Sequence, residues 1–216
     1  MNVYRLLRIN RLIKNHRIKF FGLYLLHKFN MRYLAVNLDP VMACNLRCKM
    51  CYFTDADYVR KLKGQLKDED LERIAKVIFK RALKLQIGCG TEPTLYKNLV
   101  KVVELGKHYK VPYISLTTNA NLLDEAKIKA LLDAGLDEFT ISLHGVEKES
   151  YENFMKKACY EKFHRVFNVF AKLKETRNFK SSYQAPVGGS RSKSCSWIPR
   201  NSRCRREGAG WFPKVG

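Results

Sequence analysis

Residues 41–52 read Val-Met-Ala-Cys-Asn-Leu-Arg-Cys-Lys-Met-Cys-Tyr and place three cysteines, Cys44, Cys48 and Cys51, on one short segment. The apolar run from Tyr33 to Leu38, which we expect to form a strand, comes just before them. Three thiolates this close together can bind one inorganic centre, and soft thiolates select zinc or iron–sulfur clusters. A structural zinc takes four ligands, and no fourth Cys or His lies within a few residues. The spacing favours a [4Fe–4S] cluster with one iron open to a ligand, with zinc and incidental clustering as alternatives.

Strand and helix patterns alternate through the middle of the chain. Acidic residues open the first expected helix, as the helix dipole favours, and apolar residues follow at helical spacing. The expected strands are residues 33–38, 84–88, 111–118 and 137–143; the expected helices begin at 68, 95 and 124, and a long helical stretch after 143 breaks near 159. This alternation predicts an α/β fold with a parallel sheet, about four βα units and the chemistry at the carboxyl ends of the strands.

The cysteine segment resembles the cluster motif of the radical S-adenosylmethionine enzymes, and the resemblance extends over residues 34–179. After the second expected strand, Gly-Cys-Gly-Thr-Glu-Pro at 88–93 is similar to the Gly-Gly-Glu-Pro segment of that family, with Thr91 in place of the second glycine. After the third, Thr-Thr-Asn at 117–119 is similar to its Thr-Asn-Gly. At the fourth, Ser-Leu-His-Gly at 142–145 resembles a pattern of the peptide-maturase branch, whose members often carry a SPASM domain.

The resemblance implies an incomplete (β/α)6 partial TIM barrel and two cofactors, a [4Fe–4S] cluster on Cys44, Cys48 and Cys51, and S-adenosylmethionine. The residues that it implies for cofactor binding are Tyr52, Gly90, Thr91, Glu92, Pro93, Thr118, Asn119 and Ser142. A carboxylate such as that of Glu92 suits the ammonium group of the cofactor.

The resemblance also implies a reaction. The cluster passes an electron, from a donor such as flavodoxin or ferredoxin, to the sulfonium. The resulting 5′-deoxyadenosyl radical takes a hydrogen from a substrate, for which the peptide-maturase likeness suggests a peptide or protein.

The net charge of +21 is concentrated at the two ends of the chain. Residues 1–33 hold eight Lys and Arg and no acid, and they predict a basic amphipathic helical segment. Three interpretations of this segment are a helix docked on the domain, a helix in peripheral contact with a membrane surface, and a basic arm for RNA. We see no apolar run long enough for a transmembrane segment and no secretory signal, so we expect a cytoplasmic protein.

Residues 180–216 differ in composition from the rest of the chain. They hold both tryptophans, three of the six prolines and seven serines, and they show no helical or strand period. We therefore predict a low-complexity tail, disordered or produced by a frameshift, in which the fifth strand of the barrel does not come. The core at 34–179 would then be truncated. Two alternatives to an active enzyme follow: a non-catalytic remnant, and an RNA-binding or RNA-modifying protein that uses its basic ends.

Overall fold

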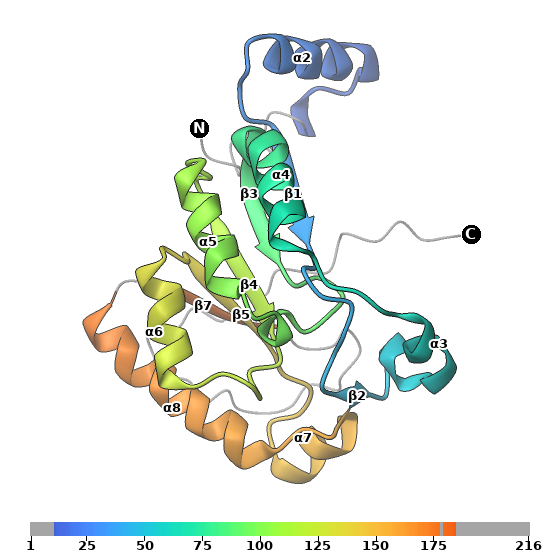
Figure 1. Ribbon diagram of the computed structural model, residues 1–216, viewed down its shortest axis with the longest axis vertical. Coiled ribbons are helices and arrows are strands. Elements are labelled where there is room, and N and C mark those ends of the chain that lie inside the picture. Colours follow the sequence, from blue (N-terminus) through green and yellow to red (C-terminus); the bar gives the residue numbers. More distant parts are fainter. Residues whose placement is uncertain (1–10, 178, 185–216) are drawn as a thin grey trace.

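The computed structural model describes residues 11–177 and 179–184. Its main feature is a sheet of five parallel strands whose order in space, β1-β3-β4-β5-β7, is their order along the chain. The strands are β1 (Leu34–Leu38), β3 (Ala82–Ile87), β4 (Ile114–Thr118), β5 (Glu138–Ser142) and β7 (Lys180–Gln184). Figure 1 shows them side by side, with their arrowheads at one edge of the sheet. The predicted α/β partial barrel is confirmed.

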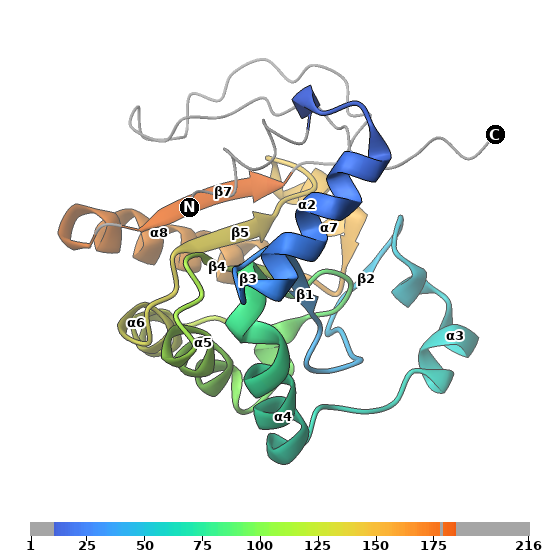
Figure 2. The ribbon, with the colours of Figure 1, turned by 90° about the horizontal axis from the view of Figure 1, so that it is seen from above.

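Helices connect consecutive strands of this sheet. They are α4 (Asp68–Ile78), α5 (Leu99–His108), α6 (Glu125–Asp133) and α8 (Tyr160–Thr176). In Figure 2, α4, α5 and α6 lie together on one side of the curved sheet. An aspartate side chain fixes the start of one of them: Asp124 Oδ1 accepts a hydrogen bond from Lys127 N at 2.7 Å and caps α6, which ends before Gly135 at a φ of +99°.

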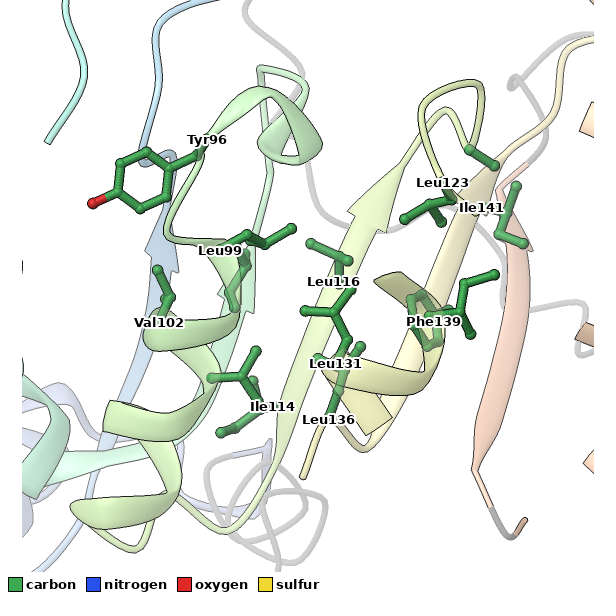
Figure 3. Packing of buried hydrophobic residues seen from close by; sticks show 14 of the residues in the cluster. Tyr96, Leu99, Val102, Ile114, Leu116, Leu123, Leu131, Leu136, Phe139 and Ile141 are labelled. Atoms are coloured by element: carbon green, nitrogen blue, oxygen red, sulfur yellow. The ribbon is translucent and has the colours of Figure 1, made fainter. Parts of the chain in front are cut away.

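Buried side chains fill the space between this helical layer and the sheet. Leu99 and Val102 of α5 and Leu131 of α6 lie toward Ile114 and Leu116 of β4 (Figure 3). On the neighbouring strand β5, Phe139 pairs in register with Leu116 and packs edge-on against Phe170 of α8, with ring centres 4.8 Å apart. These contacts bury the apolar stripe of each helix and hold the strand ends in fixed positions.

The prediction that no fifth strand follows residue 180 is wrong. β7 pairs with β5 in parallel register from Glu138–Lys180 to Ser142–Gln184. Its sequence, Lys-Ser-Ser-Tyr-Gln, has no apolar alternation, so the periodicity that reveals other strands is missing. Polar contacts hold it instead: Ser182 Oγ donates to Glu138 Oε1 at 2.8 Å and lies 3.2 Å from Thr140 Oγ1. The rest of the predicted tail, 185–216, lies outside the described residues.

A small second sheet, which the sequence did not suggest, joins two distant segments. The predicted break in the helical stretch after residue 143 is real: α7 (Lys148–Phe154) ends well before α8. Between them, β6 (Met155–Lys156) pairs antiparallel with β2 (Arg47–Cys48) of the cysteine segment. The remaining short elements are η1 (Tyr52–Thr54), α3 (Ala56–Lys61), η2 (Phe79–Arg81) and η3 (Pro93–Leu95).

The N-terminal helix α2 (His16–Lys28) projects from the sheet, as Figures 1 and 2 show. It contains no buried residue, and Phe20 is 71% exposed. The interpretation of this segment as a docked helix is therefore wrong for the described part, because its hydrogen bonds to the domain are made at the end of the helix, where Arg81 Nη1 donates to His27 O at 3.2 Å. No helix among the described residues is both long and apolar enough to cross a membrane.

Candidate functional site

The cysteine loop follows β1 and occupies the carboxyl edge of the sheet. Backbone carbonyl groups of the loop are held by side chains from the loop itself and from η1. Arg47 Nη1 donates to Cys44 O at 2.8 Å, and Thr54 Oγ1 donates to Cys48 O at 2.5 Å. The β2–β6 pair and a hydrogen bond from Lys49 N to Phe154 O at 3.0 Å fasten the loop to the segment after α7. The loop is thus held at several points.

The three thiols are partly buried and influence one another. Burial is the main cause that raises the pKa of Cys44, and burial followed by the nearby Cys44 and Cys51 thiols raises the pKa of Cys48 to about 11. A cationic metal centre would offset the cost of ionising them. Within the described residues, no three His, Cys, Asp or Glu side chains already stand together as a set of metal ligands. The donor chemistry fits an iron–sulfur cluster, and the assignment of the three ligands stays a prediction.

Glu92 lies just beyond β3 and is only 2% exposed. Its Oε1 accepts hydrogen bonds from Thr118 Oγ1 at 2.7 Å and from the hydroxyl and backbone N–H of Thr94, and its Oε2 accepts one from Asn119 N at 2.8 Å. Glu92 N also donates to Ala43 O at 2.9 Å. Residues 88–93, which follow β3 and include Glu92, are called the Gly-rich loop from here on. Glu92 therefore connects this loop to the cysteine loop and to the end of β4. Burial raises the pKa of Glu92, and the hydrogen bond from Asn119 opposes that shift.

Asparagines extend these connections to α7. Asn119 Nδ2 donates to Asn45 Oδ1 at 2.8 Å, beside Cys44. Asn121 is buried, and its Nδ2 donates to Asn119 O at 3.0 Å and to Tyr151 Oη at 2.8 Å. Its Oδ1 accepts from Cys159 N at 2.9 Å. Sequence reasoning missed Asn45 and Asn121, because a lone asparagine after a strand or cysteine is typical of many turns.

Asp39, which directly follows β1, holds the Gly-rich loop. Its Oδ1 accepts hydrogen bonds from Cys89 N at 2.8 Å and Thr91 Oγ1 at 2.9 Å, and its Oδ2 accepts one from Gly90 N at 3.1 Å. Sequence reasoning gave Asp39 no role. Its place at the end of the strand that precedes the cysteine loop was the one available signal.

The other expected binding residues gather at the same edge. Tyr52 donates its hydroxyl to Gly90 O, and Pro93 is buried and opens η3. Ser142 is the last residue of β5 and is partly buried. His144, two residues further on, has a buried Nδ1 that makes no hydrogen bond with any described residue, and burial lowers the pKa of its ring. The structure thus brings the expected Gly90, Thr91, Glu92, Pro93, Thr118, Asn119, Ser142 and Tyr52 to one edge of the sheet with the cysteine loop.

Known proteins resemble this chain over the segment that holds these residues. The model of the radical SAM superfamily matches residues 39–184, which include β7. A GTP 3′,8-cyclase of Aquifex aeolicus is 29% identical over 153 residues, or 70% of this chain and 47% of that protein. A probable GTP 3′,8-cyclase of Saccharolobus solfataricus is 36% identical over 110 residues, or 51% of this chain and 34% of that protein. The chain spans less than half the length of these relatives.

Solved structures share the fold. Native anSMEcpe with bound AdoMet aligns with a TM-score of 0.57 and 26% identity, over 71% of this chain and 44% of that chain. Streptococcus suis SuiB bound to its precursor peptide SuiA aligns with a TM-score of 0.59 and 22% identity, over 78% of this chain and 36% of that chain, and shows the fold alone. Enzymes of this superfamily use a [4Fe–4S] cluster and S-adenosylmethionine. With a family match that covers most of its length, this chain belongs to the radical SAM superfamily.

Proposed function

We propose that this chain carries the cofactor-binding part of a radical SAM enzyme. Cys44, Cys48 and Cys51 would hold the [4Fe–4S] cluster, and the strand-end residues around Glu92 would bind S-adenosylmethionine. The observation that carries this proposal is the set of hydrogen bonds of Glu92, which join three separate motifs at one edge of the sheet. Motifs that lie far apart along the chain thus meet at one edge of the sheet.

When bound, the cluster and S-adenosylmethionine supply one-electron reductive cleavage of a carbon–sulfur bond and hydrogen abstraction from a substrate. The chain's own residues bind and orient. Each carboxylate oxygen can accept more than one hydrogen bond, and Glu92 Oε2 accepts one within the described residues, from Asn119. A second, charge-assisted bond from an ammonium group would complete it. Thr118 and Asn119 keep that carboxylate from rotating, since each donates to a different oxygen.

Two substrate classes have support. The peptide or protein proposed from the sequence is supported by anSMEcpe, whose structure with the Cp18Cys peptide is 25% identical to this chain with a TM-score of 0.53. The curated relatives are named for GTP, which supports a nucleotide. Equilibrium binding of GTP and of a cysteine-containing peptide to the reconstituted protein distinguishes the two classes. Saturable binding of GTP favours the nucleotide. Binding of the peptide without binding of GTP favours the peptide.

The decisive experiment is anaerobic reconstitution with iron and sulfide, followed by reduction with dithionite and low-temperature EPR with and without S-adenosylmethionine. We expect a cluster signal that shifts when S-adenosylmethionine is added, because one iron has no cysteine ligand. A cluster that ignores S-adenosylmethionine, or no cluster, would favour a non-catalytic remnant. In the cell, we propose a donor such as flavodoxin or ferredoxin, and a cytoplasmic location, where the five described cysteines, which are free, stay reduced.

The cysteine assignment is tested by Cys44→Ala, with Cys89→Ala as the matched control. Two thiolates hold a [4Fe–4S] cluster poorly, so we expect Cys44→Ala to lose most of its iron and sulfide after reconstitution. Cys89 lies on the neighbouring loop and is exposed, so Cys89→Ala should load as the wild type does. Full loading of Cys44→Ala, measured as iron per protein, would refute the assignment.

We also propose that α2 contacts an anionic membrane surface. It presents exposed Phe20, Phe21 and Tyr24 among basic residues, and no acidic residue precedes Asp39. Basic side chains near anionic lipid contribute about 1 kcal/mol each. Co-sedimentation with phosphatidylserine vesicles should exceed that with phosphatidylcholine, and Phe20→Ser with Phe21→Ser should reduce it. Salt-sensitive binding to RNA with none to vesicles would favour the basic-arm interpretation instead.

A further inference from the structure

The Gly-rich loop after β3 is held mainly by side chains from outside it. Three consecutive residues, Cys89, Gly90 and Thr91, point donors at the carboxylate of Asp39. Cys89 is exposed and lies in no helix or strand. A loop without regular hydrogen bonds takes its shape from such contacts. Asp39 therefore determines where the backbone of this loop lies.

The peptide groups on the two sides of Gly90 are held by different residues. Asp39 Oδ2 accepts from Gly90 N at 3.1 Å, and the Tyr52 hydroxyl donates to Gly90 O. Asp39 precedes the cysteine loop and Tyr52 follows its last cysteine, so the two residues flank that loop in sequence. A Cβ at position 90 would lie 2.7 Å from Tyr52 Oη, so a side chain there would have to displace the Tyr52 hydroxyl.

The carboxylate of Asp39 makes no ion pair within the described residues. Among the residues that the structure describes, its hydrogen bonds go to Cys89, Gly90 and Thr91 of the Gly-rich loop alone. A carboxylate that accepts several backbone N–H groups fixes their direction more strongly than a neutral acceptor does. The side chain is thus suited to holding the loop in one conformation.

We propose that Asp39 is a positioning residue that acts with Tyr52 through Gly90. Together they lock the Gly-rich loop against the cysteine loop, so that the cluster and S-adenosylmethionine are presented to each other in one fixed geometry. This inference rests on the proposed function, because it assigns the locked loop to the binding of S-adenosylmethionine. Asp39 itself need not touch either cofactor.

The test compares Asp39→Ala and Asp39→Asn with Asp124→Ala, an aspartate that caps α6 and has no contact with the loop. The first readout needs no cofactor: amide hydrogen exchange at Cys89 and Gly90 in the apo-protein. The second is affinity for S-adenosylmethionine after reconstitution, with iron content measured in parallel. For Asp39→Ala we expect fast exchange at both amides, normal iron content, and affinity at least tenfold weaker than in the wild type. Asp39→Asn keeps one acceptor oxygen, so its amide exchange rates and its affinity for S-adenosylmethionine should fall between those of the wild type and of Asp39→Ala.

Asp124→Ala should lower the melting temperature while leaving affinity and loop exchange unchanged. Wild-type affinity in Asp39→Ala, with its loop amides exchanging fast, would overturn the proposal. Protected amides in Asp39→Ala would overturn it as well, because Asp39 would then not hold the loop. If the wild-type protein binds neither cluster nor S-adenosylmethionine, the proposed function fails, whereas the exchange readout still decides whether Asp39 holds the loop.

Discussion

Glu92 illustrates at the residue scale how a buried carboxylate both stabilises the site and prepares it for a ligand. Hydrogen bonds from Thr94, Thr118 and Asn119 surround it on its two oxygens. A buried, ionised carboxylate is costly unless it is fully hydrogen-bonded. An incoming ammonium group would donate a second hydrogen bond to Glu92 Oε2, in the place where water would otherwise donate one. The residue is therefore a sensitive position for substitution.

We expect Glu92→Gln to weaken binding of S-adenosylmethionine about 10- to 100-fold, because a hydrogen bond to a charged group contributes about 1.5–3 kcal/mol. The amide of the glutamine would also point a donor at Asn119 N–H. Cluster loading should be unchanged, since Glu92 is not among the expected ligands. Glu104→Gln, an exposed position on α5, is the control in isothermal titration, and equal affinities of the two variants would contradict the role of Glu92.

The raised pKa of Glu92 also predicts a dependence of stability on pH. The folded apo-protein retains this proton to a higher pH than the unfolded chain, whose glutamates titrate near 4.5. Above pH 4.5 the folded state therefore binds more protons, and the contribution of Glu92 to the free energy of unfolding falls as pH rises through the folded-state pKa. Urea denaturation at several pH values gives the free energy of unfolding as a function of pH. The slope of that free energy against pH should be less negative in Glu92→Gln than in the wild type. Identical slopes would show that burial does not shift this group.

At the scale of elements, the packing of α8 on β5 carries much of the stability of the second half of the sheet. Phe170 is 2% exposed and also lies near Phe179, with ring centres 6.0 Å apart. We expect Phe170→Ala to lower the free energy of unfolding by about 3–5 kcal/mol, because it leaves a cavity in the core. Phe154→Ala, at a position that is 43% exposed, should lower it by less than about 1 kcal/mol. Thermal and urea unfolding of the apo-protein measure both variants. Equal decreases in the free energy of unfolding for Phe170→Ala and Phe154→Ala would contradict this prediction.

The elements also show what could be predicted from the sequence. β3, β4 and β5 and their helices follow from short apolar runs and helical periodicity; β5 alternates buried and half-buried residues, whereas β4 is buried at four of its five residues. The expected site residues came from the resemblance of their motifs to the radical SAM family, and those motifs follow the ends of strands of the main sheet. β7 could not be predicted from apolar periodicity, because polar contacts to Glu138 and Thr140 hold it. β2 and β6 are two residues long, and no periodicity exists over two residues. Asp39 was missed because its role depends on a loop fifty residues away.

At the scale of the whole molecule, the five-stranded sheet has two edges within the described residues, β1 and β7. Unpaired edge strands invite association with other chains, so we expect limited solubility. The specific prediction concerns β7: a chain ending at residue 179 should melt at a lower temperature and aggregate more than one ending at 184, because β5 loses its parallel partner. Thermal melting with size-exclusion chromatography measures both. Equal behaviour of the two chains would mean that β7 contributes nothing in solution.

The agreement between strand order and chain order has a consequence for synthesis on the ribosome. Within the five-stranded sheet, each strand pairs with the strand of that sheet made just before it, whereas β2 of the small second sheet waits for β6. The chain can therefore fold vectorially, adding one βα unit at a time to a growing edge. The cysteine loop, the Gly-rich loop and the end of β4 all lie within the first 121 residues. Their hydrogen bonds to one another can thus form while later parts of the chain are still being translated. The contacts of β2 with β6 and of Asn121 with Tyr151 follow once those later residues are made.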